Sequence, residues 1–259
     1  MLHHDLPTID CRRIVAETFV AQVEHHESLE STQQRAHAVA ADRSHELPLL
    51  VIANRQTAGR GRGQNRWWTG EGSLAFSLCW DPARNQPPAI AVPQRSLAAA
   101  VATIDAVAPL VPERQVGLHW PNDIFVGGRK LAGILIDVLA DGRHILGIGI
   151  NTNNDFSGAP ADVRTRATSL VEQTGSRVDH TELLIRLLTH LEHVLDSSSP
   201  DQNPVSDRFN ELCLQHGERI TIDVGGQLTT GICKGIDRDG GLVLETANGR
   251  RRFTCGVLR

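Results

Sequence analysis

The 259-residue chain is long enough to bury a full-sized hydrophobic core, and its 40% hydrophobic and 22% charged residues are typical of a globular protein. Its formal net charge of −4 argues against a general nucleic-acid-binding protein, whose basic surface would dominate the count. The N-terminus lacks a signal peptide, and no apolar run approaches the roughly eighteen residues that a membrane span needs, so we expect a cytoplasmic protein without membrane contact.

The sequence also lacks the signatures of several common enzyme sites. It contains no P-loop, no G-x-G-x-x-G that opens a helix after a strand, no H-E-x-x-H and no G-x-S-x-G. The cysteines are odd in number, lie far apart and never form a Cys-x-x-Cys pair, which favours reduced thiols over disulfides or a zinc site. They are Cys11, Cys79, Cys213, Cys233 and Cys255.

Most of the chain is predicted to form one large sheet. Residues 47–53 are a short apolar run typical of a buried strand, and residues 73–80 alternate strictly, which predicts a half-buried strand. Residues 95–107, a run of good helix formers, predict a core helix. Further strands are predicted at residues 116–120, 130–139 and 144–150. Because these strands follow one another without intervening helices, we predict an α+β fold with a large mixed or antiparallel sheet covered on one side.

A loop between the first two predicted strands is both glycine-rich and positively charged. Residues 56–68 read QTAGRGRGQNRWW. Glycine lets a ligand lie against the backbone, and guanidinium groups suit phosphate or carboxylate. Such a repeat can also be a flexible RNA-binding segment or a surface loop, but disordered repeats of this kind do not lie between strands. We therefore expect a small-anion site, with Trp67 and Trp68 as packing surfaces for a purine or for the loop itself.

Two shorter motifs are ambiguous when each is taken alone. HWPNDIFV, residues 119–126, places Asn122 and Asp123 after a proline, which is good turn chemistry in any protein. In GGRKLAGILID, Lys130 opens a strand that contains Gly133. Lys130 is either a solvated lysine at a hairpin or a cation pointed at a substrate, and Gly133 would let that substrate approach the backbone.

Residues 179–195 carry leucines at helical spacing and predict a long amphipathic helix that ends the main domain. Asp179 is its predicted N-cap, and Glu182, three residues later, is the predicted capping-box partner. His190 and His193 form an H-x-x-H on this leucine-rich helix, where we interpret them as surface residues rather than metal ligands.

The C-terminal part has a different sequence pattern from the main domain. After a serine- and proline-rich patch at residues 197–204, short β-type runs alternate with Gly-Gly, Asp-Gly-Gly and Asn-Gly turns, which is typical of a small antiparallel barrel. We predict a main domain over residues 1–214 and a barrel over residues 215–259. Because roughly forty residues make a marginal core, we expect the barrel to dock against the main domain.

Five motifs, in this order and at these spacings, resemble the catalytic module of biotin–protein ligases. They are ESTQQ (30–34), QTAGRGRG followed by RWW (56–68), HWPND (119–123), RKLAGIL (129–135) and GIGINTN (147–153). GICKGIDRDGGLVLE, from residue 231, is similar to the family's C-terminal SH3-like barrel. The resemblance implies a class II synthetase-like catalytic domain that joins biotin to a lysine of a biotin carboxyl carrier protein, with ATP and through biotinyl-AMP.

The same resemblance implies a biotin site and an ATP site that share cationic residues. The biotin site would comprise Ser31, Thr32, Gln56, Gly59, Arg60, Gly61, Arg62, Lys130 and Gly133. The ATP site would comprise Arg60, Arg62, Arg66, Trp67, His119, Asn122, Asp123, Lys130 and Asn151. Within them, Ser31, Thr32 and Gln56 would bond the polar ureido end of biotin or line its pocket, and Asn151 would meet the adenine.

Three residues are predicted from the resemblance to be catalytic. Arg62 would hold the reactive adenylate as a charged donor, and Lys130 would bridge the carboxylate and the α-phosphate. Asp123 would orient Mg²⁺, as a tentative metal ligand, or the incoming lysine. Because both steps build charge on oxygen, catalysis should be mainly positioning and electrostatic stabilisation. Closure of the loop of residues 60–68 would exclude water from the mixed anhydride.

The chain departs from the family pattern in three places. His119 stands where lysine usually precedes Trp-Pro-Asn-Asp, and Gln33 stands where asparagine commonly follows Ser-Thr. Gln64 and Asn65 replace residues that are often basic. We therefore expect weaker ATP binding than in lysine-bearing relatives, improving as the pH falls through the imidazole pKa.

Two other interpretations stay open alongside a biotin ligase. One is a lipoate or octanoate transferase of the same fold, although that family lacks the Gly-Arg-Gly-Arg loop. The other is a non-catalytic protein that binds biotin or nucleic acid. Too few residues precede Glu30 for the winged helix-turn-helix of some relatives, so we expect no DNA binding. Relatives are often dimers through a sheet edge, and a homodimer is open here.

Overall fold

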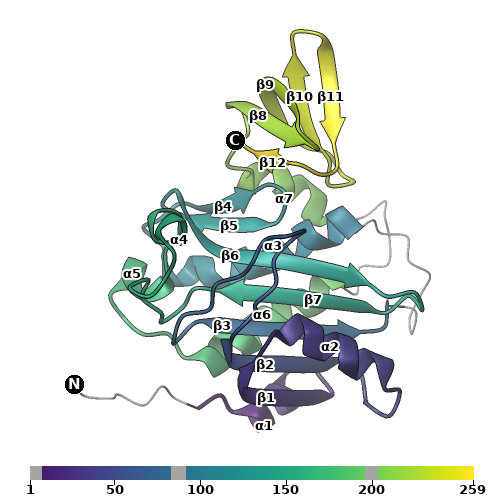
Figure 1. Ribbon diagram of the computed structural model, residues 1–259, viewed down its shortest axis with the longest axis vertical. Helices are drawn as coiled ribbons and strands as arrows, with labels where there is room; N and C mark the ends of the chain where they lie inside the picture. The colour runs from purple at the N-terminus through teal and green to yellow at the C-terminus, as the bar shows by residue number, and fades with distance from the viewer. Residues whose placement is uncertain (1–7, 83–91, 196–203) are drawn as a thin grey trace.

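The largest feature of the computed structural model, which describes residues 8–82, 92–195 and 204–259, is a seven-stranded sheet (Figure 1). Its strand order is β1-β2-β3-β7-β6-β5-β4. The strands are β1 Gln22–Leu29, β2 Leu49–Gln56, β3 Leu74–Trp80, β4 Val116–His119, β5 Asp123–Val126, β6 Arg129–Val138 and β7 His144–Ile150. β1 and β2 are parallel, and every other neighbouring pair is antiparallel. The predicted mixed sheet and all five predicted strands are confirmed.

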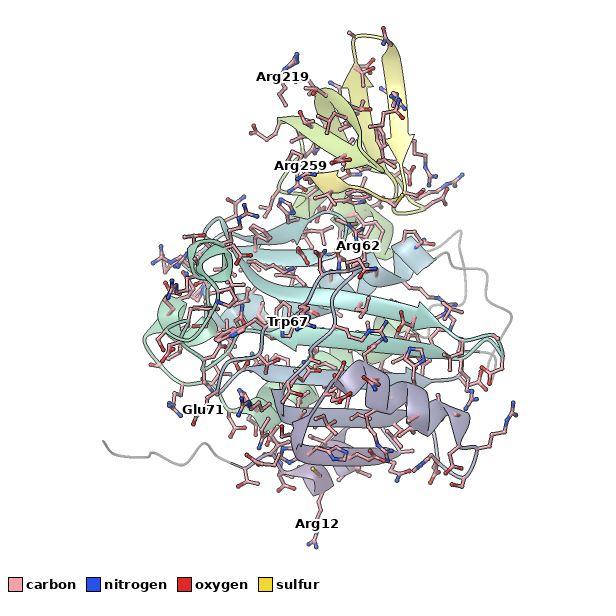
Figure 2. All side chains as sticks on the ribbon, viewed as in Figure 1. Arg12, Arg62, Trp67, Glu71, Arg219 and Arg259 are labelled. Atoms are coloured by element: carbon pink, nitrogen blue, oxygen red, sulfur yellow. The ribbon has the colours of Figure 1, made fainter. Side chains whose placement is uncertain are left out.

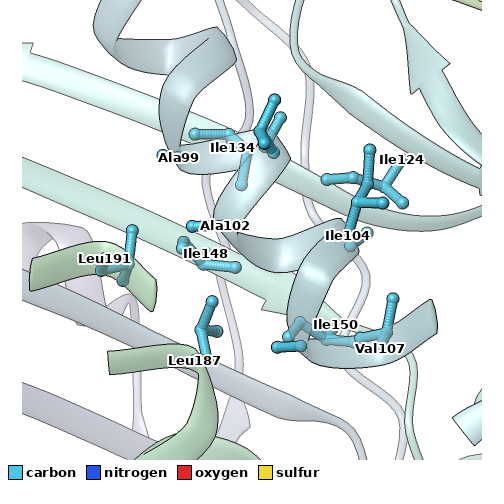
Figure 3. Close-up of a cluster of buried hydrophobic side chains, with 14 of the residues drawn as sticks. Ala99, Ala102, Ile104, Val107, Ile124, Ile134, Ile148, Ile150, Leu187 and Leu191 are labelled. Atoms are coloured by element: carbon cyan, nitrogen blue, oxygen red, sulfur yellow. The ribbon is translucent and has the colours of Figure 1, made fainter. Parts of the chain in front are cut away.

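Helices cover the two faces of this sheet unequally. The long helices α3 (Val92–Val107) and α6 (His180–Leu195) pack on one face, where Figure 3 shows Ala102 and Leu187 beside Ile148. The shorter α2 (Thr32–Ala41) packs on part of the other face and buries Cys79 of β3. Every residue of β3 is therefore buried, and the prediction of a half-buried strand was wrong. The alternation of large and small apolar residues fits a strand between two helical layers.

The N-terminus of α6 is capped as predicted. Asp179 Oδ1 accepts hydrogen bonds from the backbone N–H groups of Thr181 at 2.7 Å and Glu182 at 3.2 Å. The carboxylate of Glu182 instead accepts from Arg13 of α1 (Cys11–Glu17) at 2.7 Å. Glu182 therefore ties α6 to α1, in a contact that no local pattern predicts.

Six of the described helices were not predicted from the sequence, because each is short or lacks a clear apolar period. They are α1, α2, the 3₁₀ helix η2 (Ala108–Leu110) and the α-helices α4 (Ala161–Arg166), α5 (Leu170–Thr174) and α7 (Pro204–Leu212). Except for Pro204, which begins α7, the predicted serine- and proline-rich patch lies outside the described residues.

The C-terminal residues form a second, five-stranded antiparallel sheet with the order β11-β10-β9-β8-β12. Its strands are β8 Arg219–Val224, β9 Gln227–Ile236, β10 Leu242–Thr246, β11 Gly249–Phe253 and β12 Val257–Leu258. This sheet stands beyond the β4 edge of the large sheet in Figure 1. Trp120 Nε1 donates to the carbonyl of Gly240 at 3.1 Å, and Asn210 of α7 accepts from the N–H of Ile236 at 2.7 Å. The tail is thus docked as expected, while the boundary after residue 214 stays a prediction.

Three features are absent from the described residues 8–82, 92–195 and 204–259. No helix there is long and apolar enough to cross a membrane. No three His, Cys, Asp or Glu side chains there are grouped so that they could hold a metal ion. All five cysteines lie within these ranges, and each is a free thiol.

Candidate active site

A large cleft lies over the strands of the main sheet, beside α2. Its volume is about 1380 Å³, which exceeds the roughly 300–1,000 Å³ of a typical site for one small molecule. Residues of β3, β6 and β7, the loop after β2, the short helix α4 and the last four residues of the chain line it. The cleft therefore has room for two ligands and collects segments from most of the sequence.

The structure brings nearly all the predicted site residues to this cleft. Those that line it are Ser31, Thr32, Gln56, Gly59, Arg60, Gly61, Arg62, Arg66, Trp67, His119, Asn122, Asp123, Lys130 and Gly133. Asn151 does not line it. Asn151 is buried behind Lys130, with its Nδ2 3.5 Å from the Lys130 carbonyl oxygen. The predicted contact of Asn151 with adenine would require a rearrangement here.

Lys130 and Asp123 form an ion pair across two neighbouring strands. Asp123 begins β5 and pairs with Gly133 of β6, which brings its carboxylate to the start of β6. The distance from Lys130 Nζ to Asp123 Oδ1 is 2.7 Å. The same ammonium lies 5.6 Å from the centre of the Trp67 ring, within the range of a cation–π contact. Lys130 is therefore a positioned cation in the cleft, not a freely solvated hairpin lysine.

Glycines in the strands make room for the indole of Trp67. A Cβ atom at Gly149 would lie 2.3 Å from this ring, and one at Gly133 would lie 3.3 Å from it. Among the residues that the structure describes, the buried Trp67 Nε1 has no hydrogen-bond partner. A buried donor without a partner costs free energy, so the indole N–H is available to a ligand.

The glycine–arginine loop is folded as a tight turn beside Trp67. Gly61 N donates to the carbonyl of Asn65 at 2.9 Å, and Asn65 N donates to the carbonyl of Arg62 at 3.2 Å. Gly63 has φ of +63°, which only glycine adopts readily. Arg62 Nη2 donates to the carbonyl oxygen of Gly256 at 2.5 Å. Figure 2 shows Trp67 over the central strands and Arg62 nearer to the C-terminal sheet.

Ser31, Thr32 and Gln56 form a polar group where α2 begins. Gln56 Oε1 accepts from the backbone N–H of Thr32 at 2.8 Å and lies 3.2 Å from the Thr32 hydroxyl. Gln56 Nε2 donates to the hydroxyl of Thr69 at 3.2 Å. Ser31 Oγ is buried and, within the described part of the chain, lacks a hydrogen-bond partner. The Ser31 hydroxyl is thus a second polar group available to a ligand.

The side chains of His119 and Asn122 are held in place by contacts with neighbouring residues. His119 stacks on Phe125, with the ring centres 4.4 Å apart and the planes at 14°. Burial lowers the pKa of His119 below its ordinary 6.5, and the charge of Lys130 also lowers it, while Asp123 acts in the opposite direction. Asn122 Nδ2 donates to the carbonyl of Ile134 at 2.6 Å and so stabilises the turn before β5.

Several cleft residues were not predicted from the sequence. Residues of α4 border the cleft, among them Asp162 and Arg166, and residues 256–259 close another side. Nothing in the local pattern of α4 distinguishes it from a surface helix. The chain end reaches the cleft only because the second sheet docks beside β4. Gln33 and Ser77 also line the cleft, although Gln33 was noted only as a departure from the family motif.

Comparison with known protein families agrees with this geometry. The profile of the family described as "Biotin/lipoate A/B protein ligase family" matches residues 26–155. The profile described as "Biotin protein ligase C terminal domain" matches residues 216–257. The chain belongs to the biotin/lipoate A/B protein ligase family.

Relatives within this family cover most of the chain. The biotin–[acetyl-CoA-carboxylase] ligase of Mycobacterium tuberculosis is 36% identical over 201 residues, which cover 76% of this chain and 73% of the relative. The bifunctional ligase/repressor BirA of Bacillus subtilis is 32% identical over 235 residues, which cover 88% of this chain and 71% of the relative. A solved structure of the biotin protein ligase from Aquifex aeolicus, in complex with biotin and ATP, superposes with a TM-score of 0.79 at 27% identity. The superposition covers 92% of this chain and 99% of the Aquifex chain. The predicted resemblance and the α+β fold class are confirmed.

Proposed function

We propose that this protein is a biotin–protein ligase that uses ATP to join biotin to a lysine of a biotin carboxyl carrier protein. In the first step, an oxygen of the biotin carboxylate forms a bond to the α-phosphorus of ATP, and the bond to pyrophosphate breaks. In the second step, the amine of the acceptor lysine attacks the acyl carbon of biotinyl-5′-AMP. AMP leaves with the electron pair of the broken C–O bond, and the amine loses its proton.

The observation that carries this proposal is the meeting of Lys130 and the glycine–arginine loop in one cleft with room for two ligands. Two anions must approach each other in the first step, and a cation beside them offsets their repulsion. Asp123 fixes Lys130 through their 2.7 Å ion pair, so the ammonium needs little reorganisation during the reaction. Arg60 and Arg62 also line this cleft and supply guanidinium donors suited to phosphate oxygens.

Mg²⁺ enters this proposal as part of the ATP substrate. Asp123, the tentative metal ligand, is already paired with Lys130, and no group of three potential ligands occurs among the described residues. The donor set of the protein therefore does not fit a resident magnesium site. Mg²⁺ is commonly held by substrate phosphates together with one or two carboxylates, so the ion would arrive with ATP.

The proposal predicts biotin-dependent exchange of labelled pyrophosphate into ATP. Arg62→Ala and Lys130→Ala should each lower the exchange rate by about a hundredfold or more, the usual effect of removing one donor to developing charge. Lys234→Ala and Arg238→Ala are matched controls, because Lys234 is exposed on β9 and Arg238 is exposed in the turn after it, and they should leave exchange unchanged.

Other outcomes of this assay would identify the alternatives. Exchange that depends on octanoate or lipoate instead of biotin would indicate the transferase-type enzyme of the same fold. A wild-type protein that binds biotin but shows no exchange with any of these acids would have a binding role, and the ligase proposal would be rejected.

A further inference from the structure

A chain of polar side chains runs from the surface of α2 to the floor of the cleft. His37 Nε2 lies 2.7 Å from Asp137 Oδ2, and Gln33 Nε2 donates to the same oxygen at 3.0 Å. Gln33 Nε2 also donates to the carbonyl of Ile145 at 3.3 Å. At its other end, Gln33 Oε1 lies 3.0 Å from Ser77 Oγ, which lines the cleft.

This arrangement fixes the orientation of the Gln33 amide. Hydrogen bonds from His37 and Gln33 lower the pKa of Asp137 against the effect of its burial, so it is a carboxylate and can only accept hydrogen bonds. The carbonyl of Ile145 can likewise only accept. The NH₂ group of Gln33 must therefore face both of them, and its carbonyl oxygen must face Ser77. Gly147 permits this placement, because a Cβ atom there would lie 2.5 Å from Gln33 Oε1.

Hydrogen bonds to Gln56 and to the fixed Gln33 amide set the direction of the two neighbouring hydroxyl groups. Thr32 Oγ1 is 3.2 Å from Gln56 Oε1, a carbonyl oxygen, so the Thr32 hydroxyl donates its proton there. Ser77 Oγ is 3.0 Å from both Gln33 Oε1 and Thr32 Oγ1 and donates its proton to one of them. Both hydroxyl protons are used inside the protein, and the two hydroxyl oxygens can offer a ligand only lone pairs.

We propose that Asp137, supported by His37, is a positioning residue for the floor of the cleft, which Thr32 and Ser77 form. Asp137 keeps the oxygens of these two residues as hydrogen-bond acceptors for the N–H groups of a ligand. This inference rests on the proposed function, in which the ligand is biotin and its ureido ring carries two N–H donors. Asp137 acts through Gln33. The Gln33 side chain is long enough to contact both Asp137 and Ser77. The shorter side chain of an asparagine at this position would not reach both.

The test is calorimetric titration of the full-length protein with biotin alone and, separately, with ATP alone. Asp137→Leu removes the acceptor, frees the Gln33 amide to turn, and should weaken biotin binding by about tenfold or more, since it leaves a buried polar group mispaired. The Kd for ATP should stay within about twofold. Asp137→Asn keeps one acceptor oxygen for Gln33 and should restore most of the biotin affinity.

Two further variants make the result specific. Asp141→Leu removes a carboxylate from the turn after β6, where it bonds Arg143 away from the cleft, and should leave both Kd values unchanged. If Asp137→Leu does not fold, Gln33→Met tests the same chain, because it keeps the side-chain length without hydrogen-bonding groups.

Each outcome has a distinct meaning. Equal biotin affinity in the wild type and in Asp137→Leu, or in Gln33→Met where that variant replaces it, would overturn this inference and leave the proposed function standing. Equal loss of biotin and ATP affinity would indicate a general structural role and would also overturn it. A wild-type protein that does not bind biotin would reject the proposed function itself.

Discussion

At the scale of single residues, His119 is where this chain differs most consequentially from the family motif. Its imidazole stacks on Phe125 beside Lys130 and Asp123. Burial lowers its pKa, so the ring is neutral near pH 7 and gains a proton only below its ordinary pKa of about 6.5. ATP binding is therefore expected to improve on acidification at a lower pH than it would with an exposed histidine.

His119→Lys should lower the KM for ATP at pH 7.5 by about tenfold, because a permanent ammonium adds a charge-assisted hydrogen bond to phosphate. For the wild type, the KM for ATP should be flat above pH 6.5 and fall below it. Pyrophosphate exchange measured from pH 5.5 to 8 checks both statements. An unchanged KM with the same pH profile in the variant would show that His119 does not face the nucleotide.

At the scale of elements, the contacts of α6 separate what a local pattern determines from what packing adds. Asp179 caps the helix with two backbone hydrogen bonds, as the sequence predicts. Glu182 is used differently, in a bond to Arg13 of α1. Capping depends on residues that are adjacent in sequence, whereas the pairing of α6 with α1 depends on how both helices pack.

Asp179→Ala should lower the free energy of unfolding by about 1 kcal/mol, the usual cost of losing an N-cap. Glu182→Ala should cost less than about 0.5 kcal/mol, because its partner Arg13 is exposed and surface ion pairs contribute little. Urea denaturation of both variants measures the difference. If the two variants lost the same stability, Glu182 would be acting as a capping-box residue after all.

At the scale of the whole molecule, stability should depend on pH through a buried histidine. His180, at the start of α6, lies against Thr152 and Asn153, and its burial lowers the pKa to about 4. Between pH 6.5 and about 4 the unfolded chain binds a proton that the folded protein excludes. Stability therefore rises with pH through this window and is lost as the pH falls.

By this linkage, His180 should contribute a loss of about 3 kcal/mol across that window. His180→Gln cannot take up the proton in either state, so its unfolding free energy should vary less with pH over the same range. Denaturation curves at pH 4.5, 5.5 and 7 for both proteins provide the measurement. Parallel pH dependence in the variant and the wild type would assign the effect to other groups, such as Asp137 or Glu24, whose pKa values are also lowered.

The sequence by itself determined five of the seven strands of the main sheet, all but β1 and β5, and the family. Turn glycines, apolar alternation and five spaced motifs are local features, and they act through residues that are close in the chain. The same motifs identified the fourteen predicted site residues that line the cleft. They did so because strands and their adjoining loops carry these side chains directly to one face of the sheet.

Only the tertiary structure decided how those residues are partnered. It placed α2 over the second face of β3, joined Lys130 to Asp123, and set Trp67 against Gly149. It also brought Gly256 to Arg62, 194 positions away in sequence. Such contacts depend on the packing of two sheets and their helices as rigid layers, and no local period or spacing encodes the relative placement of distant layers.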